Sequence, residues 1–198
     1  MRSESSTASD GEAVLDSLRI AYRRVLLGIA ARDLSGLAPM DTIAAWLSDL
    51  ADDVLEAALA VARAGVGAEY ATCRFAVVGM GKCGAHELNY VSDVDVIFVH
   101  EDSADRAASV ARTVLSVMGG SSPDGIVFRT DADLRPEGRA GPLSRSLNAT
   151  VAYYEHHADA WEFQALLKAR PVAGDRDLGA RFRTAIEPLV WPETLDPD

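Results

Sequence analysis

The sequence has little cysteine, few basic residues and no long hydrophobic run. Its two cysteines, Cys73 and Cys83, exclude a disulfide-stapled scaffold and indicate reduced thiols in a cytoplasmic protein. Its 19 Lys and Arg residues are outnumbered by 30 Asp and Glu, which gives a formal net charge of −11. Unaided binding to nucleic acid or to an anionic membrane surface is therefore not expected, because both depend on a basic surface.

Hydrophobic segments are also short. No apolar run approaches the ~20 residues that a membrane span needs, and the N-terminal MRSESSTASD lacks the apolar centre of a signal peptide. The composition is nevertheless that of a folded chain, with 48% hydrophobic and 25% charged residues. We therefore expect a cytoplasmic globular protein of one large or two small domains.

A helical pattern dominates the first third of the chain. Residues 1–9 are rich in serine and predict a disordered tail, and Ser9 with Glu12 fits a capping box at the start of a helix. Apolar residues then recur every three or four positions in two amphipathic helices. These helices form a lead-in over residues 10–70, and their apolar stripes indicate core packing.

Strands and turns replace this pattern over residues 71–145. In order, the elements expected there are a strand over 74–79, a short helix over 85–90, a strand over 93–99, a helix over 103–118 and a strand over 126–134. Residues 146–198 are helical again, in three pieces broken near residue 158 and at residues 171–174. The sequence thus predicts an α/β (α+β) fold, a small sheet flanked by helical segments at both ends.

A glycine-rich turn, Gly79-Met80-Gly81-Lys82-Cys83-Gly84, follows the first strand. One interpretation is a dinucleotide-binding G-x-G-x-x-G motif, with Glu101 or Asp102 roughly 20 residues on to hold a ribose. The segment between this turn and Asp93 is too short for a dinucleotide-binding fold, because a crossover to a parallel strand takes about a dozen residues or more. The carboxylates in the next strand also have no purpose in such a fold.

Those carboxylates support a second interpretation. Residues two apart in a strand face the same side, so Asp93 and Asp95 project together while Val94 and Val96 face the core. Two neighbouring like charges repel each other, and a divalent cation is the usual remedy. Oxygen ligands favour a hard ion such as Mg²⁺. The alternative is an edge strand with solvated surface aspartates.

The third expected strand offers a further carboxylate, from Asp131 or Asp133, again two residues apart. Backbone N–H groups of the glycine turn would cradle phosphates, and Lys82 would add a positive charge. Metal ions that bridge phosphate oxygens stabilise in-line displacement at phosphorus. A glycine turn followed by D-x-D and a later Asp is the pattern of a polymerase-β-type nucleotidyltransferase, with a small mixed sheet.

Longer motifs resemble one family more specifically. They are LRIAYRRVLLGIAARDLSG, GMGKCGAHELNYVSDVDVIFV, TDADLRPEGRAGPL and WEFQALLKARPVAGD. In this order they resemble the glutamine synthetase adenylyltransferase/adenylyl-removing enzyme family from about residue 17 to about residue 191.

The resemblance implies a bifunctional enzyme of nitrogen metabolism with two nucleotidyltransferase copies and regulatory helical domains. The N-terminal copy removes AMP from a tyrosine of glutamine synthetase by phosphorolysis and releases ADP, and the C-terminal copy attaches AMP from ATP. The stretches KCG and ELNYVSDVDVIFV resemble the N-terminal, adenylyl-removing copy more than the C-terminal one. The alternatives are adenylylation of glutamine synthetase from ATP, and an inactive fragment that only binds glutamine synthetase or a PII signalling protein.

Carried over by motif position, Asp93, Asp95 and Asp131 would be the catalytic residues and would hold two Mg²⁺ ions. Asp133 ranks below Asp131, because the family pattern commonly has a variable or basic residue there. The residues that the resemblance implies in binding nucleotide or phosphate are Gly79, Gly81, Lys82, Gly84, Ser92, Arg135 and Arg139.

Four further polar residues receive no chemical role. His86 departs from the small or basic residue expected at its position, and Glu87 has a structural role. Lys168 and Arg170 are expected on the solvated face of a helix.

The chain also differs from the family in extent. It begins within the helical lead-in and ends soon after Trp191, so a second catalytic copy and regulatory helices are missing. The sequence therefore looks like a truncated member of the family, in which docking, regulation and activity need a direct test.

Overall fold

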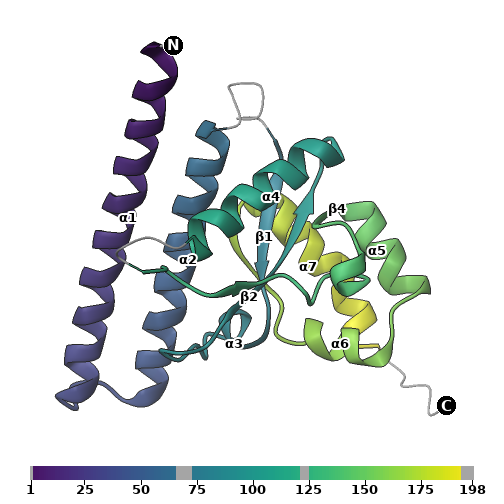
Figure 1. The fold of residues 1–198 in the computed structure, drawn as a ribbon. Coiled ribbons are helices and arrows are strands. Elements are labelled where there is room, and N and C mark those ends of the chain that lie inside the picture. The colour runs from purple at the N-terminus through teal and green to yellow at the C-terminus, as the bar shows by residue number, and fades with distance from the viewer. Residues whose placement is uncertain (1, 66–72, 121–124, 193–198) are drawn as a thin grey trace.

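Two long helices lie side by side along one flank of the sheet (Figure 1). The computed structural model describes residues 2–65, 73–120 and 125–192. The first helix, α1, spans Arg2–Leu34 and the second, α2, spans Met40–Gly65. Together they form the helical lead-in that the apolar periodicity predicts.

Helix α1 begins earlier than predicted. Residues 2–9, expected as a disordered tail, are helical, and the capping box of Ser9 and Glu12 lies inside the helix. The first nine residues contain neither proline nor glycine, the two residues that most strongly oppose helix formation. No local signal therefore prevents the helix from beginning as early as Arg2.

Helix α2 is the central packing element of the lead-in. Its buried residues recur at helical spacing and are Ile43, Leu47, Ser48, Leu50, Ala51, Val54, Leu55, Ala58, Leu59 and Ala62. Ser48 is the polar member of this set. Its hydroxyl donates to Ala44 O (2.9 Å) and accepts from the backbone N–H of Leu88 (3.2 Å). It therefore ties α2 to the loop that follows the glycine turn.

Five strands form a mixed sheet in the order β3-β2-β1-β5, with β4 also paired to β2. Their bounds are β1 Phe75–Gly79, β2 Val94–His100, β3 Thr130–Asp131, β4 Ser144–Ser146 and β5 Arg170–Gly174. β1 is antiparallel to both β2 and β5, while β3 and β4 are parallel to β2. The antiparallel β1–β2 pair contradicts the dinucleotide-binding interpretation, which requires a parallel crossover at this point.

The two faces of the sheet are covered by different helices. The helices that join α2 in covering the sheet are α4 Ala104–Gly119, α5 Leu147–His156, α6 Ala160–Leu166 and α7 Arg176–Val190. Phe75 and Val77 of β1 pack into one core cluster with α2 and α4, whereas Ala76 and Val78 pack into a second cluster with α5, α6 and α7. The sheet is thus a buried middle layer, which confirms the predicted α/β class.

Two elements differ from the sequence prediction in position or length. The helix predicted over residues 85–90 is wrong: the short helix α3 spans Gly81–Gly84, and the chain then turns. His86 has a left-handed backbone, with φ 58°, a conformation that a helix cannot continue through. The strand predicted over residues 126–134 is reduced to Thr130–Asp131.

Strand β5 is absent from the sequence prediction, which assigned residues 171–174 to a break between helices. Pro171 explains the omission, because proline lacks the N–H donor that a central strand needs. β5 lies at the edge of the sheet, beside β1, and proline is tolerated in edge strands.

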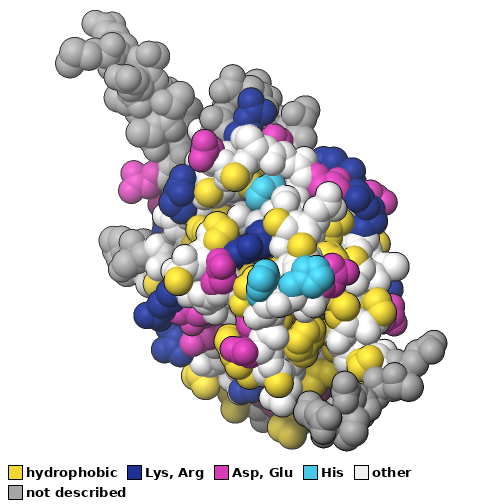
Figure 2. All heavy atoms as spheres, turned by 90° about the vertical axis from the view of Figure 1, so that its right-hand side faces the viewer, with side chains coloured by type: hydrophobic (Ala, Val, Ile, Leu, Met, Phe, Trp, Pro, Cys, Tyr) yellow, Lys and Arg dark blue, Asp and Glu magenta, His cyan; other side chains and the backbone are white. Residues whose placement is uncertain are grey.

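The outer surface is mixed in character. On the side of α5 and α6, acidic and basic side chains are interspersed with hydrophobic ones (Figure 2). Within the described residues, none of the helices combines the length and the apolar character needed to cross a bilayer.

Candidate active site

The predicted carboxylates gather at the start of β2. The parallel pairing of β2 with β3 places Asp95 opposite Asp131, and Asp93 directly precedes β2. The pKa of Asp95 is raised, first by its partial burial and then by the negative charges of Asp131 and Asp93, while Lys82 lowers it. The negative charges of Asp93 and Asp131 therefore act on Asp95.

The alternation predicted for this strand is confirmed. Val94 and Val96 are fully buried in the core cluster that contains α2 and α4. Asp95 lies between them in sequence and is partly exposed, so its side chain belongs to the other face of the strand.

The start of the glycine turn lies against Asp95. The backbone N–H of Met80 donates to Asp95 O (2.8 Å), and a Cβ at Gly81 would lie 3.0 Å from Asp95 Oδ2. Gly81 also has φ +50°, which favours glycine. A Cβ at Gly84 would lie 2.0 Å from Lys168 O, so the turn is pressed against the chain that leads into β5. The glycines thus bring backbone close to the carboxylates.

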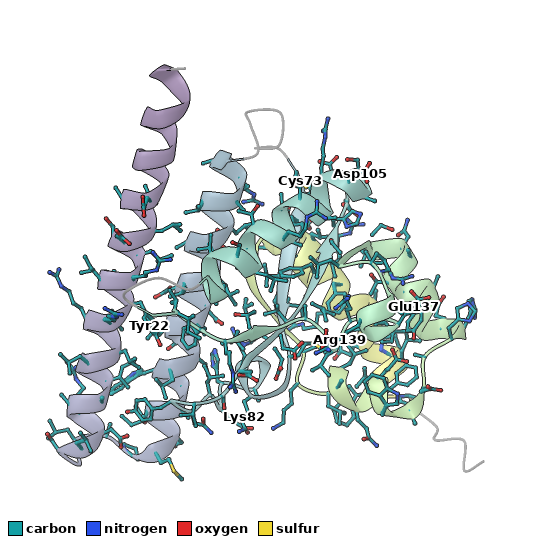
Figure 3. All side chains as sticks on the ribbon, in the orientation of Figure 1. Tyr22, Cys73, Lys82, Asp105, Glu137 and Arg139 are labelled. Atoms are coloured by element: carbon teal, nitrogen blue, oxygen red, sulfur yellow. The ribbon has the colours of Figure 1, made fainter. Side chains whose placement is uncertain are left out.

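Lys82 and Ser92 lie together at the rim of this turn. Lys82 Nζ donates to Ser92 Oγ (3.3 Å), and Ser92 Oγ donates to Asn89 Oδ1 (2.9 Å). Lys82 is exposed, and Figure 3 shows its side chain at the end of the domain opposite Asp105.

The two predicted arginines have different surroundings. Arg135 has a side chain only 11% exposed and donates to the backbone carbonyls of Ala132 (2.9 Å) and Gly141 (3.2 Å), so it braces its own loop. Arg139, labelled in Figure 3, is exposed and its Nε lies 2.5 Å from Asp133 Oδ2. That pairing lowers the pKa of Asp133 and draws its carboxylate toward Arg139.

Arg129 is a site neighbour that the sequence prediction missed. Its guanidinium forms an ion pair with Asp93, which raises the pKa of Arg129. The available signal was its position two residues before Asp131, because residues two apart share a face in extended chain. In this structure the positive charge that pairs with Asp93 comes from Arg129.

The donor chemistry of Asp93, Asp95 and Asp131 fits Mg²⁺, which prefers carboxylate oxygens. Burial is the largest cause of the raised pKa of Asp95, and the negative charges of Asp131 and Asp93 raise it further; a bound cation relieves that repulsion. The three carboxylates are not tightly clustered. Among the described residues, the group of three whose ligand atoms lie within 4.8 Å of one another is Asp49, Asp52 and His86.

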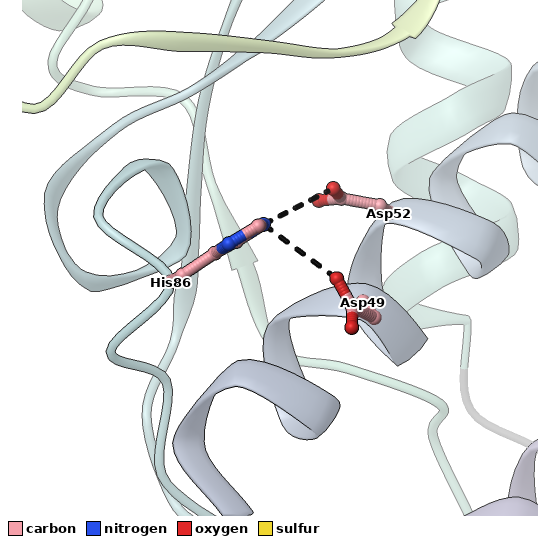
Figure 4. Close-up of side chains that lie close together, drawn as sticks. All are labelled: Asp49, Asp52 and His86. Carbon is pink, nitrogen blue, oxygen red and sulfur yellow. Dashed lines mark ion pairs between the residues drawn. The ribbon is translucent and has the colours of Figure 1, made fainter. Parts of the chain in front are cut away.

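That second group joins α2 to the loop after the glycine turn (Figure 4). His86 Nε2 lies 3.6 Å from Asp49 Oδ1 and 3.9 Å from Asp52 Oδ2. The carboxylate of Asp52 already accepts two hydrogen bonds from Arg170, so much of its capacity to hold a cation is taken. Arg170 lies on β5, which corrects the prediction that placed it on a solvated helix face.

Comparison with known proteins gives a consistent result. Residues 2–185 match the family described as glutamate-ammonia ligase adenylyltransferase. The chain is 54% identical over 186 residues to a protein of Streptomyces coelicolor, covering 88% of this chain. It is 50% identical over 185 residues to one of Mycobacterium tuberculosis, covering 90%, and 48% identical over 194 residues to one of Mycobacterium avium, covering 95%.

Each of these relatives is named as a bifunctional glutamine synthetase adenylyltransferase/adenylyl-removing enzyme. The chain spans 19%, 18% and 19% of their respective lengths. The family match covers most of the chain, as the motifs predicted, and the chain therefore belongs to the glutamate-ammonia ligase adenylyltransferase family.

Proposed function

We propose that this chain is a nucleotidyltransferase domain that removes AMP from an adenylylated tyrosine of glutamine synthetase, with phosphate as cosubstrate and ADP as product. The observation that carries the proposal is the placement of Asp95 opposite Asp131 beneath a glycine turn, in a chain of this family. The relatives' names supply glutamine synthetase as the protein substrate.

In this reaction an oxygen of phosphate bonds to the phosphorus of AMP, and the tyrosine oxygen leaves. Asp93, Asp95 and Asp131 would hold two Mg²⁺ ions, which supply positive charge to the phosphate oxygens when bound. The backbone of the glycine turn would bind the phosphates, with Lys82 and Ser92 at its rim. Arg139 would release its ion pair with Asp133 and bind a phosphate oxygen instead.

Arg129 has a defined place in this proposal. It pairs with Asp93, so cation binding at Asp93 competes with the guanidinium. Arg135, by contrast, donates to two backbone carbonyls and to Asp133 (3.4 Å), and we assign it to holding the loop that carries Arg139 rather than to phosphate.

The test is to mix the purified chain with adenylylated glutamine synthetase, Mg²⁺ and phosphate, and to measure ADP. We expect ADP from the wild type and none from Asp95→Asn. Asp105→Asn is the matched control, because Asp105 lies at the opposite end of the domain from Lys82 (Figure 3). ADP that persists in a folded Asp95→Asn variant would contradict the assignment of the site.

The relatives' bifunctional names favour one second candidate, adenylylation of glutamine synthetase from ATP. The same proteins incubated with ATP, Mg²⁺ and unmodified glutamine synthetase distinguish it, because AMP would then appear on the synthetase. A folded chain inactive in both directions would instead support a binding-only role toward glutamine synthetase or a PII signalling protein.

A further inference from the structure

Arg170 contacts the last residues of the glycine turn, Cys83 and Gly84. Its Nε donates to Gly84 O (3.1 Å) and its Nη2 donates to Cys83 O (3.1 Å). These carbonyls lie at the C-terminal end of the short helix α3, where carbonyl oxygens have no partner within the helix, although Cys83 O also accepts from the backbone N–H of His86 (3.3 Å). The guanidinium thus holds the end of the turn through its backbone.

Asp52 of α2 fixes the orientation of that guanidinium. Arg170 Nη1 lies 2.5 Å from Asp52 Oδ2, and Nη2 lies 3.1 Å from Asp52 Oδ1, a forked pair. Counting the two carbonyls, Arg170 uses four of its five N–H donors. The side chains of Arg170 and Asp52 are 28% and 19% exposed, so solvent screens this pair only in part.

The first residues of the same turn contact Asp95, a candidate metal ligand. Met80 N–H donates to the backbone carbonyl of Asp95, and Gly81 lies against its carboxylate, because a Cβ there would be 3.0 Å from Asp95 Oδ2. The turn is therefore held by Asp95 at its start and by Arg170 at its end. A displacement at Arg170 moves the backbone that would meet the phosphates.

We propose that Arg170 is a positioning residue for the phosphate-binding turn, acting through the carbonyls of Cys83 and Gly84 and oriented by Asp52. This inference rests on the proposed function, because it assumes that the turn binds phosphate. Lysine cannot replace Arg170, since a single ammonium lacks the planar fork that spans a carboxylate and two carbonyls.

The experiment measures binding of Mg·ADP to the full chain by calorimetry, in the wild type, Arg170→Lys and Asp52→Asn. Arg74→Lys is the matched control. Arg74 also grips a carboxylate with two nitrogens, at 2.8 and 3.2 Å from Asp175, but it lies away from the turn. Thermal unfolding of each variant reports whether it folds.

We expect Arg170→Lys and Asp52→Asn each to weaken Mg·ADP binding about tenfold or more, because a turn that must be ordered on binding has a lower affinity than one that is already held in place. Arg74→Lys should bind as the wild type does. In the phosphorolysis assay the KM for phosphate should rise while the KM for adenylylated glutamine synthetase stays unchanged. General loosening of the fold would raise both.

Unchanged affinity in a folded Arg170→Lys or Asp52→Asn variant would overturn the inference and leave the proposed function standing. An equal loss in Arg74→Lys would also overturn it, since the effect would then reflect stability alone. Wild-type protein that fails to bind Mg·ADP would overturn the proposed function together with the inference. If Arg170→Lys does not fold, Asp52→Asn decides, because it leaves Arg170 in place.

Discussion

Replacing Asp95 by asparagine should make the metal-free protein more stable, although it should abolish catalysis. Asp95 and Asp131 are paired on neighbouring strands, whose backbones lie about 5 Å apart. Two unit charges at that distance repel by about 1 kcal/mol in water and about 3 kcal/mol at an effective dielectric constant near 20. Partial exposure of Asp95 favours the lower value.

The assay is thermal unfolding in EDTA, where about 1 kcal/mol corresponds to a rise of about 2–4 °C for a chain of this length. The pKa of Asp95 is raised in the folded state, so the folded protein binds this proton more tightly than the unfolded chain does. Ionised Asp95 therefore costs stability above its raised pKa, and the cost disappears as pH falls below the ordinary value. The advantage of Asp95→Asn should shrink in the same window.

Added Mg²⁺ should reverse the order of stability. Saturating metal stabilises a protein that binds it, by about 2.7 kcal/mol at 100 times Kd, and the Asn variant should gain much less. Asp105→Asn, the control, should respond to Mg²⁺ as the wild type does. A less stable Asp95→Asn protein in EDTA, or an equal gain from Mg²⁺, would refute the electrostatic account of the site.

Three further outcomes are expected. Arg129→Gln should tighten Mn²⁺ binding severalfold in calorimetric titration, because the guanidinium no longer competes for Asp93; weaker binding would contradict this. Asp175→Asn should lower the free energy of unfolding at neutral pH. Arg74 holds the pKa of Asp175 at about 2, so the difference from wild type should fade as pH drops from about 4 to about 2 in urea titrations, whereas a constant difference would speak against the ion pair. Burial raises the pKa of the Cys83 thiol to about 12, so iodoacetamide at pH 8 should modify Cys83 far more slowly in folded than in unfolded protein; equal rates would show that the thiol is accessible.

Local sequence patterns predict much of this fold because burial is periodic. The alternation around Val94 and Val96 locates β2 and the side from which Asp95 projects, and both valines are buried as expected. The spacing of apolar residues in α2 likewise locates its buried face. The pairing of Asp95 with Asp131 depends on β3 lying parallel to β2, which periodicity does not show; the resemblance implied only that the two residues share a metal site.

The rest depends on contacts between distant residues. Arg170 meets Asp52 across 118 positions and Cys83 across 87, so no local pattern shows that it braces the glycine turn. Pro171 hides β5, because its suitability depends on the strand being at an edge. Arg135 shows a similar limit, because its place in the motif does not reveal that its guanidinium donates to carbonyls of its own loop.

The brevity of β3 makes assembly of the site a local equilibrium. Two residue pairs join β3 to β2, together with the hydrogen bond from Val94 N to Arg129 O (2.8 Å). A ladder this short can open while β1 and β2 remain folded, since opening energies differ between parts of one protein. Any cation or phosphate that bridges Asp131 to Asp95 would stabilise the closed segment. Ligand affinity at this site would then include the free energy of ordering β3, and hydrogen exchange in β3 would slow as ligand binds.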